Sequence, residues 1–158
     1  MPVSDTKIRI ARPDERSRVL SVYAAAGYRR TIDPADIVWL AEDGEDAVGI
    51  VRVAAEHGTL VLRGMRIAER ARRQRLGTRM LEGIAAWLRD RECYCVPYPH
   101  LVEFYGQIGF TVLEPAAGPA FLAERIAEYR RSGQEAILMR RTTARLSGGH
   151  QPLTYRRS

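Results

Sequence analysis

The sequence has few of the features that mark membrane, secreted or metal-binding chains. Its 158 residues contain no apolar run that approaches the roughly 18 residues of a membrane-spanning helix. Residues 1–12 lack the apolar region of a secretory signal. Cys93 and Cys95 are the only cysteines, and residues two apart on a strand point the same way, which does not suit an ordinary disulfide. We therefore expect no membrane span, a cytoplasmic protein, and reduced, buried thiols with no metal role.

Lysine is also nearly absent. Lys7 is the only lysine among 25 basic residues, so the formal charge of +6 comes almost entirely from arginine, a bias typical of a GC-rich bacterial genome. A basic chain can bind nucleic acid, but its charge also suits a partner that carries several phosphates. The sequence has no basic stripe interleaved with aromatic residues, which makes nucleic acid the less favoured partner. Salt-sensitive nucleic-acid binding remains an alternative.

The length and the 46% hydrophobic content predict a single domain with one continuous core. We assign this domain to residues 1–141. Residues 142–158 contain Arg145, Arg156 and Arg157 but no acidic residue, together with Gly and Pro. This composition is typical of a basic, flexible C-terminal tail.

Alternating apolar residues and turn signals predict the strands. We place them at residues 7–12, 37–42, 47–55, 59–67, 93–96, 110–113 and 134–140. Asp43-Gly44-Glu45-Asp46 and His57-Gly58 are typical of tight turns that join three strands in series as hairpins.

Helical spacing of apolar residues predicts the remaining elements. Asp14 begins a first helix that ends at Gly27, and Asp33-Pro34 favours a short second helix. Further helices follow the loop at residues 72–78, precede Gly109, and occupy residues 119–131. This order predicts an α/β fold in which a mixed sheet carries helices on its faces.

The loop Arg72-Arg73-Gln74-Arg75-Leu76-Gly77-Thr78 is the most informative stretch, because it links a predicted strand to a strongly periodic helix. The first N–H groups of a helix have no intrahelical partners and lie at the positive end of its dipole. The junction therefore favours an anion, and the arginines around it add long-range attraction. Strand, loop and helix in this order are typical of a diphosphate-binding site.

This loop resembles the acetyl-CoA loop of the GNAT superfamily of N-acetyltransferases, whose pattern is Gln/Arg-x-x-Gly-x-Gly/Ala. Arg72 and Gly77 match the first and last positions, whereas Arg75 stands where the first glycine is expected. Downstream, Phe104-Tyr105-Gly106-Gln107-Ile108-Gly109-Phe110 is similar to the family's Tyr-x-x-x-Gly-Phe segment. The resemblance spans residues 8–141. It implies a mostly antiparallel sheet of about six or seven strands, whose fourth and fifth strands splay apart to admit the cofactor.

The resemblance implies acetyl-CoA as the co-substrate and no metal. Backbone groups of Met65, Arg66 and Ile67 would pair with the pantetheine arm as though it were an added strand, and one N–H would polarise the acetyl carbonyl. The phosphates would lie against Arg72, Arg73, Arg75, Leu76, Gly77 and Thr78. Ordinary core packing is the alternative role for Met65 and Ile67.

Tyr105 lies four residues before Gly109, the position from which the family's tyrosine protonates the departing sulfur of CoA. A phenol with an ordinary pKa of about 10 is protonated at neutral pH and suits this acid role. Packing beside Phe104 is the other interpretation. Many members of the family also carry an asparagine near the end of the fifth strand, seven residues before the tyrosine, and Tyr98 occupies that position here.

The general base is harder to assign, because the strand at residues 59–67 has no carboxylate. His100 is the first candidate, since histidine titrates near neutral pH and this one opens the helix of Tyr105. Glu103, Glu42 and Glu56 are further candidates, and a water chain could serve instead.

Substrate selection is expected from Tyr28, Arg29 and Arg30, between the first two helices, and from Tyr98. The arginine pair could bind a carboxylate or phosphate of the acceptor, or could simply be solvated. The predicted function is transfer of an acetyl group from acetyl-CoA to a primary amine, on a small molecule or a protein, in a ternary complex. A catalytically weak CoA-binding sensor is the alternative. The last strand and its helix could form a homodimer edge.

Overall fold

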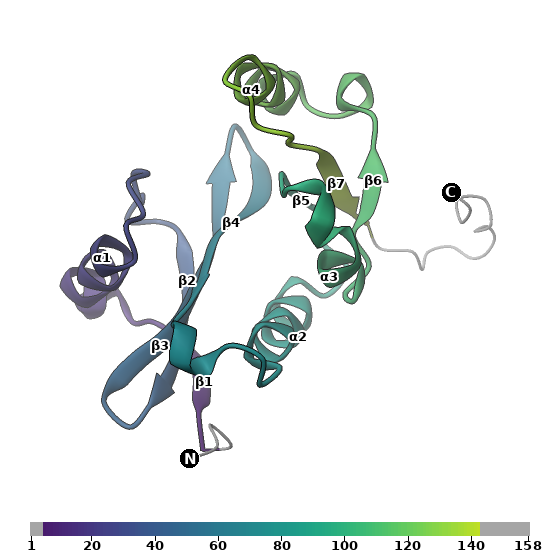
Figure 1. Ribbon diagram of the computed structural model, residues 1–158. Helices are drawn as coiled ribbons and strands as arrows, with labels where there is room; N and C mark the ends of the chain where they lie inside the picture. Colours follow the sequence, from purple (N-terminus) through teal and green to yellow (C-terminus); the bar gives the residue numbers. More distant parts are fainter. Residues whose placement is uncertain (1–4, 143–158) are drawn as a thin grey trace.

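The protein folds around one seven-stranded sheet, seen in a computed structural model that describes residues 5–142 (Figure 1). The strands are β1 (Lys7–Ile10), β2 (Ile37–Asp43), β3 (Asp46–Glu56), β4 (Thr59–Ile67), β5 (Cys93–Cys95), β6 (Thr111–Leu113) and β7 (Leu138–Arg141). Their order is β1-β2-β3-β4-β5-β7-β6. All neighbouring strands are antiparallel except β4 and β5. The predicted mixed, mostly antiparallel sheet is confirmed.

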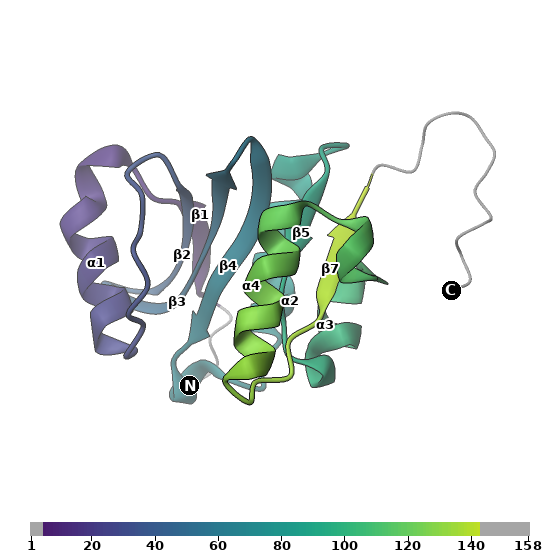
Figure 2. The ribbon, with the colours of Figure 1, turned by 90° about the horizontal axis from the view of Figure 1, so that it is seen from above.

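Helices cover both faces of this sheet. They are α1 (Arg16–Ala25), α2 (Leu76–Leu88), α3 (Val102–Gly106) and α4 (Ala120–Arg131). In Figure 1, α1 and α4 lie on one face and α2 and α3 lie on the other. Figure 2 shows β4 in the space between α1 and α4. None of the helices within residues 5–142 has the length and apolar character needed to cross a bilayer.

The alternating residues of β2 show how the two faces are filled. Val38 and Leu40 belong to the cluster under α1, whereas Trp39 and Ala41 belong to the larger cluster under α2. Five α2 side chains are fully or almost fully buried there: Leu76, Met80, Leu81, Ile84 and Leu88. The strong helical periodicity of this segment is thus explained by one continuous apolar face. In α1, Val19 and Tyr23 are buried, whereas Leu20 is 40% exposed.

A bulge in β4 changes which side chains share a face. Arg63 pairs with Arg52, and Arg66 pairs with Ile50, so β4 has two residues where β3 has one. Gly64 lies in this bulge with a φ of +68°, a conformation that glycine tolerates best. Because partners across a ladder share a face, Arg63 and Arg66 both point to the side of α1 and α4.

The two central strands diverge beyond the bulge. β4 and β5 pair in parallel at Val61 and Tyr94, and no pairing between them extends to Arg63–Ile67 within the described chain. This splay agrees with the fold that the sequence implied. Cys93 and Cys95 in β5 are both buried and free, as predicted.

Two predicted elements need correction. The short helix after Asp33 is wrong, because Asp33 Oδ1 accepts the N–H of Ala35 at 2.8 Å and the chain makes a turn. Asp36 is held by Arg52 of β3, which anchors this turn on the sheet. The last strand begins at Leu138 rather than at residue 134. Apart from Thr142, the predicted basic tail lies outside the residues that the structure describes.

Candidate active site

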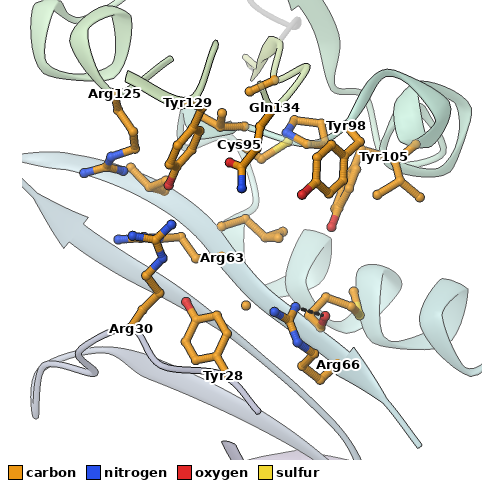
Figure 3. A pocket seen from close by; sticks show the side chains of 18 residues that line it. Tyr28, Arg30, Arg63, Arg66, Cys95, Tyr98, Tyr105, Arg125, Tyr129 and Gln134 are labelled. Atoms are coloured by element: carbon orange, nitrogen blue, oxygen red, sulfur yellow. Dashed lines mark hydrogen bonds between the residues drawn. The ribbon is translucent and has the colours of Figure 1, made fainter. Parts of the chain in front are cut away.

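A cavity of about 380 Å³ opens where β4 and β5 diverge. Its walls come from β4, the segment before β2, the segment after β5, and α4. Figure 3 shows the side chains that point into it, among them Tyr28, Arg30, Arg63, Arg66, Tyr98, Tyr105, Arg125, Tyr129 and Gln134. The cavity therefore collects residues from across the chain at the splay.

Tyr105 faces this cavity from α3. Its ring packs edge-on against Phe104, with 5.0 Å between ring centroids, and against Phe110, with 6.1 Å. Its hydroxyl points into the cavity in Figure 3. Burial, and to a lesser degree the neighbouring Cys95, raises the pKa of Tyr105 well above its ordinary value. The packing and acid interpretations are thus compatible, since the ring packs while the hydroxyl keeps its proton.

The backbone of β4 forms one edge of the cavity. Met65 and Arg66 line it, and Ile67 follows directly at the end of the strand. The β5-facing edge of this stretch has no strand partner within residues 5–142. Extended backbone with unused hydrogen-bonding groups can pair with an extended ligand, as the resemblance implies.

The loop before α2 accommodates Arg75 at the position where the family pattern has a glycine. Arg75 adopts φ +60° and ψ 19°, the left-handed conformation that a glycine would favour. This conformation costs a non-glycine residue about 1–2 kcal/mol of conformational free energy. The backbone path of the loop is therefore retained with an arginine in the glycine position, and the Arg75 side chain is exposed.

The start of α2 offers free donors. The N–H groups of Leu76, Gly77 and Thr78 have no acceptor among residues 5–142. They lie at the positive end of a 13-residue helix, where an anion is stabilised. Thr78 Oγ1 donates to Gln107 Oε1 at 3.1 Å, which ties this helix start to the residue that follows α3.

The other loop residues have distinct roles. Arg72 donates from Nε to the carbonyl of Ile67 at 3.1 Å, which fixes the exit from β4. Arg73 is exposed and also has a positive φ, of 66°. A Cβ at Gly77 would lie 2.9 Å from the ring of Phe104. Gly77 is therefore required for close packing of α2 on α3, whatever it contributes to phosphate binding.

Of the predicted substrate residues, Tyr28, Arg30 and Tyr98 line the cavity, whereas Arg29 does not. His100 also lies outside the cavity lining. It is exposed, its ring centroid is 6.0 Å from that of Tyr98, and both line a separate shallow recess. Tyr98 is common to the recess and the cavity. The base role of His100 stays a prediction.

Two of the three glutamates considered as bases accept hydrogen bonds from arginines. Hydrogen bonds from Arg9 and Arg18 lower the pKa of Glu42. Burial raises the pKa of Glu56, but hydrogen bonds from Arg125 and Arg63 outweigh it and leave that pKa lowered. A carboxylate with a lowered pKa is a poor proton acceptor near neutral pH. Glu103 is exposed and does not line the cavity.

Arg52 was not singled out from the sequence, although it is only 1% exposed. Its Nε donates to Asp36 at 2.9 Å and its Nη1 donates to the hydroxyl of Tyr28 at 2.7 Å. A charged residue inside the apolar run of β3 was the available signal. Arg63, Arg125, Tyr129 and Gln134 of the lining were also missed, because they lie far apart in the sequence. Within the described chain, no group of His, Cys, Asp and Glu side chains forms a metal site.

Comparison with protein families agrees with this geometry. The "Acetyltransferase (GNAT) family" matches residues 7–110, which is more than half of the chain. The protein therefore belongs to the GNAT acetyltransferase family. No curated protein matches it in sequence.

Solved structures share the fold at low sequence identity. A GNAT-family acetyltransferase from Streptococcus pneumoniae is 17% identical with a TM-score of 0.62, covering 88% of this chain and 99% of its own. One from Elizabethkingia anophelis with acetyl-CoA bound is 11% identical with a TM-score of 0.56, at 88% and 99% coverage. N-acetylglutamate synthase from Neisseria gonorrhoeae, complexed with coenzyme A and N-acetyl-glutamate, is 16% identical with a TM-score of 0.64. That match covers 89% of this chain but only 35% of the synthase.

Proposed function

We propose that this protein transfers an acetyl group from acetyl-CoA to a primary amine within a ternary complex. The observation that carries the proposal is the cavity at the splay, into which the buried, protonated Tyr105 points beside the unpaired edge of β4. The free N–H groups at the start of α2 fit the phosphates of the same co-substrate. Neighbours described with coenzyme A or acetyl-CoA bound support this choice.

Each step of the chemistry can be given to a residue of this chain. When bound, acetyl-CoA supplies an activated acetyl group as a thioester. The β4 backbone at Met65, Arg66 and Ile67 orients the donor, and one N–H there stabilises negative charge on the carbonyl oxygen. Tyr105 gives its proton to the sulfur as the carbon–sulfur bond breaks and the carbon–nitrogen bond forms. His100, or a water chain past Tyr98, accepts the proton of the amine.

A second function, a CoA-binding sensor with little catalysis, rests on a specific observation. The cavity lining includes no Asp or Glu, so no carboxylate among the described residues is placed to act directly as a base there. Such a sensor would bind acetyl-CoA through the same loop and the same strand edge.

Calorimetric titration with acetyl-CoA, followed by thiol release in the presence of amines, tests the proposal. Saturable binding and thiol release that depends on the amine are the expected results. Binding without amine-dependent release across a broad panel would favour the sensor. The absence of any binding would overturn both functions.

A further inference from the structure

The cavity at the splay is strongly positive. Arg30, Arg63, Arg66 and Arg125 line it, and they come from three different parts of the chain. Figure 3 shows these arginines around the opening beside Tyr28 and Tyr129. A cavity lined by one sign of charge attracts ligands of the opposite sign and repels like-charged ones. This electrostatic pattern limits which acceptors can enter.

Two of the four guanidinium groups are already paired with a carboxylate. Glu56 accepts from Arg63 at 2.7 Å through Oε2 and from Arg125 at 2.6 Å through Oε1. This carboxylate holds the two arginines in place at the wall of the cavity. It also removes much of their capacity to bind a second anion.

Arg30 and Arg66 have no carboxylate partner within residues 5–142. Each lies over an aromatic ring instead: Arg30 is 5.5 Å from the Tyr129 centroid and Arg66 is 4.9 Å from the Tyr28 centroid. A guanidinium that stacks on a ring leaves N–H groups at its edge free for a bidentate carboxylate. Toward the described residues, Arg66 uses one donor, which binds the Met65 carbonyl at 3.0 Å.

The position of Arg66 is determined by the backbone of β4 and by the ring that it packs against. The bulge at Gly64 turns Arg66 to the same face as Arg63, toward the cavity. The ring under Arg66 is fixed as well, because the Tyr28 hydroxyl accepts from the buried Arg52 at 2.7 Å. A fixed aromatic platform lowers the entropy that Arg66 loses when it binds an anion.

We propose that Arg66 and Arg30 bind a carboxylate of the acceptor, so that the acceptors are small amines carrying a carboxylate, such as amino acids and their derivatives. This inference rests on the proposed function and deepens it. Polycationic amines and lysine-rich protein segments are disfavoured, because Arg30, Arg66 and the remaining net positive charge of the lining repel them. The positive charge of the cavity therefore selects the acceptor when it binds, before acetyl transfer.

The direct test compares pairs of acceptors that differ only in the carboxylate. For each amino acid and its carboxamide, kcat/KM for acetyl transfer is measured, with a polyamine as a third arm. We expect at least a tenfold preference for the acid, because a hydrogen-bonded ion pair is lost in the amide. Equal efficiency for acid and amide, or preference for the polyamine, would overturn the carboxylate site.

The variants Arg30→Gln and Arg66→Gln test whether these two arginines form the carboxylate site. Each should raise KM for the amino acid by about 10- to 100-fold, with a smaller effect on kcat and on the carboxamide. Arg131→Gln on α4 is the matched control, since Arg131 is exposed and outside the cavity lining. An unchanged preference for the acid in both cavity variants would refute the assignment.

Titration with acetyl-CoA separates this inference from the proposed function. Arg30→Gln, which leaves β4 intact, should bind acetyl-CoA as the unaltered protein does. If the unaltered protein acetylates no amine at all, the proposed function fails. If it acetylates amines without regard to their carboxylate, only the carboxylate site fails.

Discussion

Tyr105 shows how one residue can be structural and chemical at once. Its ring packs against Phe104 and Phe110, and its hydroxyl reaches the cavity. Burial raises its pKa, so the phenol keeps its proton throughout the physiological range. An acid that stays protonated until it meets a departing thiolate is what the transfer requires.

We expect Tyr105→Phe to lower kcat by about 10²- to 10⁴-fold, because it removes the proton donor and keeps the packed ring. Affinity for acetyl-CoA, measured by calorimetry, should change little. Because the pKa is raised, loss of kcat through ionisation of Tyr105 should begin only above about pH 10. A variant with unchanged kcat would show that water, and not Tyr105, protonates the sulfur.

Glu15 provides a pH-dependent contribution to stability. Hydrogen bonds from the Arg9 side chain and the Arg12 N–H lower the pKa of Glu15 from 4.5 to about 2. A carboxylate whose pKa is lowered by folding stabilises the protein above its unfolded pKa, and this stabilisation is lost as pH falls through the folded pKa. Glu15→Gln should therefore cost about 1 kcal/mol or less at pH 7.

The difference between Glu15→Gln and the unaltered protein should shrink between pH 4.5 and pH 2, as followed by urea unfolding. Glu124→Gln, at an exposed position of α4, should show no such dependence. A constant difference across this window would contradict the assigned ion pair with Arg9.

Individual site residues were predictable from sequence only where a local pattern marked them. Tyr105 was predicted from its spacing to Gly109. Tyr28 and Arg30 were predicted from their position between the first two predicted helices. Arg52 was missed because its partners, Asp36 and Tyr28, reach it across the sheet. The buried ion pair between Arg52 and Asp36 depends on tertiary packing, which cannot be inferred from the spacing of residues in the sequence.

At the scale of elements, the bulge of β4 organises the site. It lets β4 leave β5, and it places Arg63 and Arg66 on one face. Local turn residues identified the hairpins around β4, and its ends agree with the prediction at residues 59–67. The bulge itself was not predictable, because register depends on the partner strand.

Gly64→Ala should destabilise the protein by about 2–4 kcal/mol. The new Cβ would lie 2.7 Å from Arg52 Nη1 and 2.8 Å from the Tyr23 hydroxyl, in a left-handed conformation. Urea unfolding measures the loss. Gly106→Ala is the matched control, since a Cβ there meets nothing within 4 Å, and it should leave stability nearly unchanged. A Gly64→Ala protein of ordinary stability would contradict the packing described for the bulge.

The loop before α2 gives a second prediction at this scale. Because Arg75 has a φ of +60°, Arg75→Gly should be more stable than Arg75→Ala by about 1 kcal/mol. At Glu82, an exposed position inside α2, the sign should reverse, since glycine weakens a helix relative to alanine. Thermal unfolding of Arg75→Gly, Arg75→Ala, Glu82→Gly and Glu82→Ala measures these differences in stability. The same sign at both positions would contradict a left-handed residue at the loop.

At the scale of the whole molecule, the site exists because helices cover both faces of a sheet that opens in its middle. Tyr105 comes from α3, whereas Arg125 comes from α4 and Arg30 from the segment that follows α1. Figure 1 shows α3 on one face of the sheet and α1 and α4 on the other. The hairpins that join β2, β3 and β4 were predictable from turn residues, and the splay of β4 from β5 was implied by the family resemblance. The insertion of β7 between β5 and β6 was not predictable, because the last strand of the chain separates two strands that are consecutive in the sequence.

The most direct measurement of the central claim is mass spectrometry of amine acceptors incubated with the protein and acetyl-CoA. We expect an acceptor heavier by one acetyl group, formed in equal amount to free CoA, with amino acids acetylated in preference to polyamines. A protein that binds acetyl-CoA saturably and yields no N-acetylated product from any amine would contradict the proposed acetyl transfer.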